Sequence, residues 1–245
     1  LTIVILTFNF LVAIVGVVVL LYQLRVERLK HAAFRVRATG LMPRLTMGRG
    51  KKWHLFLSHN WANQDVVALI KRQMQLVLPG IKIFLDKDDL KDLKHLERYV
   101  GQSQALLVLL GTPGYFGSKA CVRELTRAQE LQLALVLVHD GNDKTGAPLA
   151  KLQEACAHSL DESARAFIFG SRDDARDIVP WQRVAAFQMA SLLQIAEQLL
   201  HAAPAFSEVE TVLPLSLPGE GEQLSLVAPS VRGLTFIGAR DQLLT

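Results

Sequence analysis

The chain has 245 residues, half of them hydrophobic, and a formal net charge of +4, a size that allows one sizeable domain with additional segments. The two cysteines, Cys121 and Cys156, indicate a reducing compartment and exclude a disulfide framework or a cysteine-based zinc site. The positive charge does not indicate binding to nucleic acid, because residues 25–52 carry +8 and residues 53–245 therefore carry −4.

The first 22 residues, "LTIVILTFNFLVAIVGVVVLLY", contain no charged side chain. As a helix they would extend roughly 33 Å, which is enough for the hydrocarbon core of a bilayer. The run is longer than the apolar core of a signal peptide, and no small-residue cleavage site comes after it. A buried helix is the other alternative, but Val and Ile occur on every face. The sequence therefore predicts a transmembrane helix over residues 1–24, as the single or last span.

Residues 25–52 form a basic juxtamembrane linker in this interpretation. Basic residues directly after a span favour the cytoplasmic side and attract anionic lipid headgroups. Alternatively, the charges only set the topology. In both cases we expect a membrane protein whose remaining residues face the cytoplasm.

Short apolar runs then alternate with amphipathic stretches, which predicts one α/β domain over residues 53–203. We expect a flavodoxin-like three-layer sandwich with a five-stranded parallel sheet in the order 2-1-3-4-5, and functional loops at the carboxyl ends of the strands. Residues 204–245 read as a linker and the start of an unassigned C-terminal segment. The predicted strands cover residues 54–58, 81–86, 105–111, 133–140 and 164–170, and the main helices cover residues 65–78, the region of Glu124, 148–159 and 182–203.

Several protein classes with this architecture are excluded by the residues at the ends of the strands. A response-regulator receiver needs an acidic cluster after its first strand, where this chain has "SHNW", and an Asp after its third, where it has "LGTP". Neither a Gly-x-Gly-x-x-Gly fingerprint nor a Gly-Lys-Ser/Thr loop is present. His54 and His59 do not have the spacing of metal ligands, so we expect no metal.

Four motifs resemble the Toll/interleukin receptor (TIR) domain family. "HLFLSHNW" is similar to the first box of that family, and "IKIFLDKDDL" to its second strand and BB loop. "LVLLGTPGYFGSKACVREL" is similar to the third strand and the signature that ends Cys-Leu-x-Glu-Leu, and "VPWQRVAAFQMASLLQIAEQLL" to the last helix. The resemblance covers residues 53–203.

The resemblance implies a role for Glu124, which stands where NAD-cleaving TIR domains carry their catalytic glutamate. A carboxylate there would stabilise the positive charge that develops on the ribose when the bond to nicotinamide breaks. NAD+ would be the substrate, and no cofactor is expected. The alternative is an ordinary helical glutamate in contact with solvent. In both cases we expect Glu124→Ala to change stability by less than about 1 kcal/mol, because a surface glutamate on a helix contributes little.

The family lines its nucleotide pocket after the first strand. By resemblance, Ser58 and Trp61 are candidates for substrate binding, with packing and capping as equal alternatives. Phe116 and Tyr115 are candidates for stacking on a base, with anchoring of the loop as the alternative. Three others, Asp86, Asp89 and Leu90, are assigned to the BB loop and its assembly surface. One departure from the family is Asp92, which stands where the BB loop usually has Gly.

Two functions fit this interpretation. One is a membrane-anchored cytosolic TIR signalling domain that self-associates and hydrolyses NAD+ as an NAD+ nucleosidase. The other is a non-enzymatic TIR adaptor that recruits other TIR domains. A transferase or lyase acting on another nucleotide is a third alternative. Expected partners are other TIR domains, further copies of this chain, and membrane lipid contacted through residues 1–22 and 25–52, but not nucleic acid.

Overall fold

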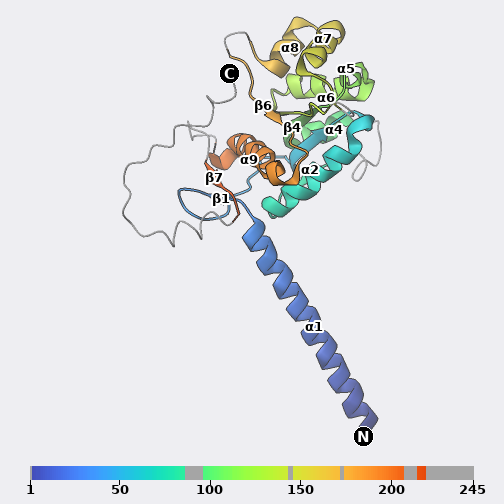
Figure 1. Cartoon of the computed structure of the whole chain (residues 1–245), viewed down its shortest axis with the longest axis vertical. Coiled ribbons are helices and arrows are strands. Elements are labelled where there is room, and N and C mark those ends of the chain that lie inside the picture. Colours follow the sequence, from blue (N-terminus) through green and yellow to red (C-terminus); the bar gives the residue numbers. More distant parts are fainter. Residues whose placement is uncertain (1, 86–95, 143–145, 172–173, 207–213, 219–245) are drawn as a thin grey trace.

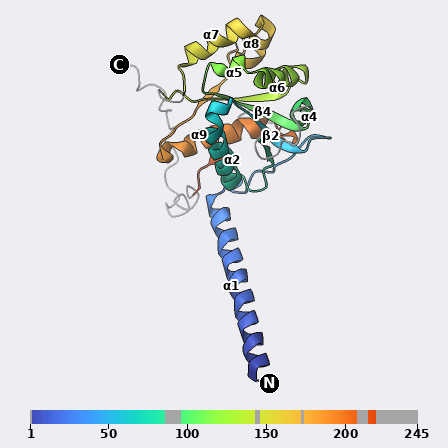
Figure 2. The same cartoon turned by 90° about the vertical axis from the view of Figure 1, so that its right-hand side faces the viewer.

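The computed structural model describes residues 2–85, 96–142, 146–171, 174–206 and 214–218. A long helix, α1 (Thr2–Ala32), projects from a compact α/β domain (Figures 1 and 2). The large apolar side chains of α1 between Phe10 and Leu24 are exposed. Within the described part of the chain, no helix combines the length and the apolar character needed to cross a membrane. The transmembrane helix therefore stays a prediction from the sequence.

Five parallel strands form the central sheet of the domain, in the order β3-β2-β4-β5-β6. Counted along the chain within this sheet, that order is the predicted 2-1-3-4-5. The central strand β4 lies between β2 and β5, so that Ala105 is opposite both Leu55 and Ala134. The strands are β2 (Trp53–Ser58), β3 (Ile83–Phe84), β4 (Ser103–Leu110), β5 (Ala134–His139) and β6 (Ile178–Pro180).

The prediction of a strand over residues 164–170 is wrong. These residues belong to a helix, α8 (Glu162–Phe169), and the fifth strand is β6. The helix begins because the Asp161 side chain accepts a hydrogen bond from the Ala164 N–H at 2.8 Å, and it ends at Gly170 with φ 82°. A short apolar run such as "AFIF" fits either element by periodicity, and only these two capping residues distinguish the helix.

Helices cover both faces of the sheet, as the three-layer prediction requires. One face packs against α2 (Gln64–Val77) and α9 (Ala185–His201), and the other packs against the remaining helices. Those are α4 (Leu96–Gly101), α5 (Gly114–Gly117), α6 (Lys119–Glu130), α7 (Leu149–Ser159) and α8. Two short 3-10 helices, η1 (Trp61–Asn63) and η3 (Pro204–Phe206), complete the described helices.

A second, two-stranded sheet joins the segments that flank the α/β domain. Here β1 (Arg35–Val36) pairs antiparallel with β7 (Leu215–Ser216). Phe34 and Leu215 are buried in the core beneath α2 and α9, and the Glu197 carboxylate accepts a hydrogen bond from the Leu215 N–H at 3.1 Å. Residues on both sides of the range 53–203 therefore contribute to the folded core.

Candidate functional site

Three polar side chains meet at the carboxyl edge of the sheet. Ser58 is the last residue of β2, Tyr115 lies in α5, and Glu124 lies in α6. The Ser58 Oγ donates a short hydrogen bond to Glu124 Oε2, and it lies 2.5 Å from the Tyr115 Oη. Because a serine hydroxyl has one proton, the Tyr115 hydroxyl is the donor to Ser58. The three residues thus form a directed chain that ends on the carboxylate.

All three side chains are buried. Ser58 and Tyr115 are completely inaccessible, and Glu124 is 5% exposed. The interpretation of Glu124 as a solvent-exposed helical residue is therefore wrong. A buried carboxylate needs donors to replace water, and the Ser58 hydroxyl is one of them.

The burial of Glu124 results from the periodicity of α6. The buried residues of this helix are Cys121, Glu124, Leu125 and Ala128. They have the spacing i, i+3, i+4, i+7, which puts them on one helical face toward the sheet. The same spacing is visible in the sequence, so this signal could have indicated that Glu124 points inward.

Two contacts fix where α6 begins relative to the sheet. The Ser118 Oγ accepts a hydrogen bond from the Cys121 N–H at 3.4 Å and serves as the N-cap. The Cys121 Sγ donates to the His59 carbonyl oxygen at 3.3 Å. Since His59 comes directly after Ser58, this second bond holds the helix next to the end of β2.

The loops after β2 and β4 are joined to each other around the site. The Asn60 Nδ2 donates to the Gly114 carbonyl at 3.0 Å, while its Oδ1 accepts from the Ala62 N–H. Gly111 passes so close to Asn63 that an added Cβ would lie 2.6 Å from the Asn63 Nδ2. Sequence reasoning missed both asparagines, although the polar run directly after the first strand was a usable signal.

Burial raises the pKa of Tyr115 well above its usual value, and the neighbouring Cys121 and Glu124 add to this effect. The phenol therefore keeps its proton near neutral pH. This protonation state agrees with the hydrogen-bond direction, in which Tyr115 donates to Ser58.

The remaining candidates lie in different surroundings. Trp61 is 67% exposed on η1, so its ring is accessible next to the end of β2. Phe116 is buried, with its ring edge-on to Tyr115 at a centroid distance of 5.2 Å. The predicted BB-loop residues Asp86, Asp89 and Leu90 lie outside the described residues.

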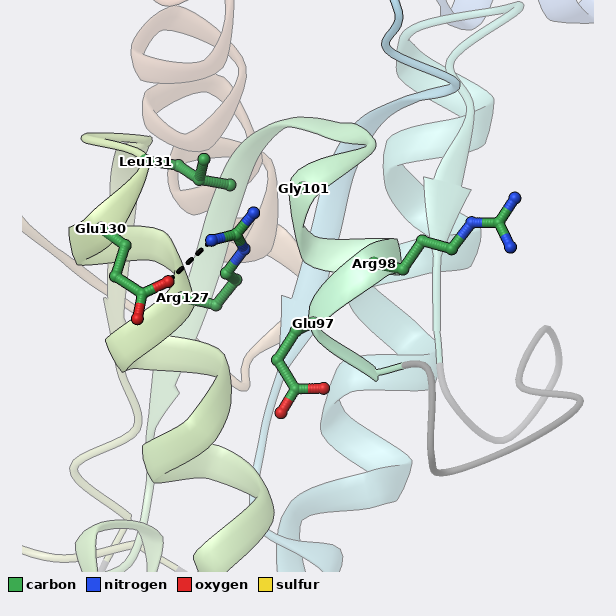
Figure 3. Close-up of a pocket in the computed structure, with 6 residues that line it drawn as sticks. All are labelled: Glu97, Arg98, Gly101, Arg127, Glu130 and Leu131. Atoms are coloured by element: carbon green, nitrogen blue, oxygen red, sulfur yellow. Dashed lines mark hydrogen bonds and ion pairs between the residues drawn. The ribbon is translucent and has the colours of Figure 1, made fainter.

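A groove of about 550 Å³ lies elsewhere, between α4 and the end of α6 (Figure 3). Arg127 pairs with Glu130 at 2.7 Å along it, and Arg123 pairs with Glu97 at 2.6 Å nearby. Glu124 does not line this groove. Among the residues that the structure describes, no group of three or more His, Cys, Asp or Glu side chains could hold a metal ion.

No family model and no curated protein matches the chain. Among solved structures, it is similar to the TIR domains of the activated Roq1 resistosome that directly recognises the pathogen effector XopQ. The identity is 18%, the TM-score is 0.42, and the alignment covers 60% of this chain and 99% of that one. It is also similar to the TIR domain of the Toll-related receptor TRR-2 from Hydra magnipapillata, with 14% identity and a TM-score of 0.29. That alignment covers 36% of this chain and 70% of the other. The structures to which this chain is similar thus include TIR domains.

Proposed function

We propose that the α/β domain is a TIR-type signalling domain that cleaves NAD+ between nicotinamide and ribose, with Glu124 as the catalytic carboxylate. One observation carries this proposal. A carboxylate at the carboxyl edge of a parallel sheet is buried, and it is held by a hydroxyl from the neighbouring strand. Ligands of open α/β sheets bind at this edge, and buried carboxylates with defined partners are typical of catalytic sites.

The reaction needs little from the protein except electrostatic stabilisation. The bond between C1′ of the ribose and the pyridinium nitrogen breaks, and its electron pair leaves with neutral nicotinamide. The ribose then acquires oxocarbenium character, which the negative charge of Glu124 stabilises. Water adds to C1′ and releases a proton, so that the products are nicotinamide, ADP-ribose and H+.

Trp61 is the candidate for contact with a ring of the dinucleotide. It is exposed, placed on η1, and only three residues from Ser58. Aromatic side chains at such positions supply a flat apolar surface for a heterocycle. Replacing Trp61 with Ala should therefore raise KM for NAD+ with little effect on kcat.

A non-enzymatic assembly domain is the second candidate. It is favoured by the low exposure of Glu124 and by the exposed apolar residues Val184 and Phe187 at the start of α9. Exposed apolar side chains of this size are common in interaction surfaces. In this case the chain would bind further copies of itself or other TIR domains.

Attachment to a membrane is part of the proposed function and rests on the sequence. Residues 1–22 are uncharged, and residues 25–52 carry +8. Attachment would raise the effective concentration of the domains in the plane of the bilayer, so that weak contacts between them suffice for assembly. Co-flotation with vesicles that contain anionic lipid tests this: the full chain should float, whereas recovery of all protein in the dense fraction would overturn it.

The decisive assay is the release of free nicotinamide from NAD+ by the purified chain, both in solution and crowded on vesicles. The proposal predicts release that Glu124→Gln lowers by about a hundred- to thousand-fold, the usual effect of lost charge stabilisation. Release of no nicotinamide under either condition would overturn the enzymatic proposal. Self-association detected in the same samples would then identify the assembly domain.

A further inference from the structure

We propose that Ser58 and Tyr115 are positioning residues that hold the Glu124 carboxylate in a closed resting arrangement, and that the ribose hydroxyls of the substrate displace the Ser58 hydroxyl from it. This inference rests on the proposed function and assigns a regulatory device to the same site. It also changes the roles that resemblance suggests, since Ser58 and Tyr115 then act through Glu124 and do not touch the substrate.

The relative accessibility of the three side chains supports the proposal that substrate contacts Glu124 and not the two hydroxyls. Ser58 and Tyr115 have no accessible surface, while part of Glu124 reaches it. Glu124 is therefore the member of the three that a ligand arriving from solvent can reach, whereas the two hydroxyls are enclosed.

The two hydroxyls are also fixed in place. Ser58 belongs to β2 and is paired in register with Val108 of β4, inside the sheet. The Tyr115 ring packs against Phe116 and is enclosed in the core. Glu124, in contrast, has two methylene groups and can turn about them. When the arrangement opens, the moving group is therefore the carboxylate.

The hydrogen bond from Ser58 has two consequences for the reaction. It orients Glu124, and it occupies Oε2, one of the oxygens that a ribose hydroxyl needs. Substrate must exchange one hydrogen bond for another, which is nearly balanced in free energy. Without Ser58 substrate no longer has to displace this hydrogen bond, but the carboxylate loses a group that orients it.

The kinetic test uses Ser58→Ala and the milder Tyr115→Phe. For Ser58→Ala we expect kcat to fall roughly tenfold, the effect of one hydrogen bond to a charged group, while KM for NAD+ does not rise. Tyr115→Phe should show a smaller change of the same kind. A rise in KM without a fall in kcat would overturn the proposal, because it would show direct contact with substrate.

Ser103→Ala is the matched control. Ser103 is also fully buried in the sheet, and its hydroxyl donates to the Tyr99 carbonyl oxygen at 2.9 Å, but it lies at the start of β4, away from Glu124. The loss of this hydroxyl should leave kcat unchanged. An equal fall in kcat in Ser58→Ala and Ser103→Ala would show that the loss of any buried serine hydroxyl in the sheet lowers kcat. That result would overturn the proposal.

A second readout does not depend on catalysis. Carboxyl groups are labelled with a water-soluble carbodiimide and an amine, and the rate at Glu124 is measured by mass spectrometry, with the exposed Glu130 as internal standard. We expect Glu124 to react several-fold faster in Ser58→Ala than in wild type or Ser103→Ala, and faster in Tyr115→Phe. Equal rates in all four proteins would overturn the closed arrangement. If wild type cleaves no NAD+, the proposed function fails, and the labelling still decides whether Ser58 covers the carboxylate.

Discussion

Helix α6 carries two glutamates, six residues apart, in opposite environments. Glu124 faces the sheet, is 5% exposed, and accepts a hydrogen bond from Ser58. Glu130 is exposed at the end of the same helix, where it pairs with Arg127 at the groove beside α4 (Figure 3). The residue type and the helix are identical, so position around the helix axis and available donors account for the difference. A carboxylate on this helix becomes a candidate catalytic group when it faces the sheet and when hydrogen-bond donors stabilise its burial.

The largest expected effect comes from an acid placed in the core without donors. Phe84 is completely buried and stacks on Phe56 at 4.9 Å and on Tyr99 at 4.7 Å. Phe84→Asp should lower the free energy of unfolding by about 3–5 kcal/mol, because its charge would have no partner. Urea denaturation measures the change. A loss below about 1 kcal/mol would show that a carboxylate can be buried in this core without hydrogen-bond donors. Donors would then not explain why the protein tolerates the burial of Glu124.

Glu124→Ala should have an intermediate effect on stability. The variant loses a buried side chain and its hydrogen bond, although Ser58 and Tyr115 can still bond to each other. We expect a loss of about 1–3 kcal/mol, in place of the change below about 1 kcal/mol that an exposed position would give. Thermal and urea denaturation distinguish a buried Glu124 from an exposed one. A change within about 0.5 kcal/mol, on the order of a surface substitution, would contradict the buried placement.

Alkaline pH perturbs the core on this face of the sheet, which contains Tyr115 and Cys156, without mutation. Burial raises the pKa of the Cys156 thiol to about 11, and the pKa of Tyr115 is also raised. Both groups therefore ionise at lower pH in the unfolded chain than in the folded one. The pKa of the thiol in the unfolded chain is near 9, and below that pH the contribution of both groups to the free energy of unfolding is fully present. As the pH rises from there toward 11, the unfolded chain binds fewer protons than the folded chain, so the free energy of unfolding falls. Unfolding free energies at about pH 8 and about pH 10.5 measure this.

Cys156→Ser separates the two groups in the alkaline series. Serine does not ionise in this range, so the variant should lose less stability than wild type does between the two pH values. An identical pH dependence in both proteins would contradict the contribution of the Cys156 thiol.

The smallest effect is expected on the exposed side. Glu130→Ala removes a surface ion pair with Arg127, in which both side chains contact solvent. Such pairs contribute between zero and about 1 kcal/mol, and we expect a loss below about 0.5 kcal/mol that shrinks further in salt. A loss as large as that of Glu124→Ala would remove the distinction between the two glutamates.

Apolar periodicity was sufficient to predict the first four strands of the parallel sheet, because each of them reads as a short apolar run. It failed at residues 164–170, where the apolar run is too short to distinguish a strand from a helix and capping by Asp161 decides. It also could not predict that Phe34 and Leu215 enter the core, since this depends on the pairing of β1 with β7, two segments far apart in the sequence.

The candidate site was predictable only in part. The motif located Glu124, and the spacing of Cys121, Leu125 and Ala128 would have indicated that it points inward. The contact between Ser58 and Tyr115 could not be predicted, because it depends on how α5 packs over the end of β2. Periodicity orients a side chain relative to its own element but does not identify its partner on another one.

A paired comparison of Glu124→Gln and Glu130→Gln in one nicotinamide-release assay is the sharpest test of the catalytic role of Glu124. Both substitutions remove one charge from α6 and keep the shape of the side chain. We predict that Glu124→Gln loses at least about a hundredfold in rate, whereas Glu130→Gln stays within about twofold of wild type. Equal rates in the two variants would contradict the assignment of Glu124 as the residue that carries the reaction.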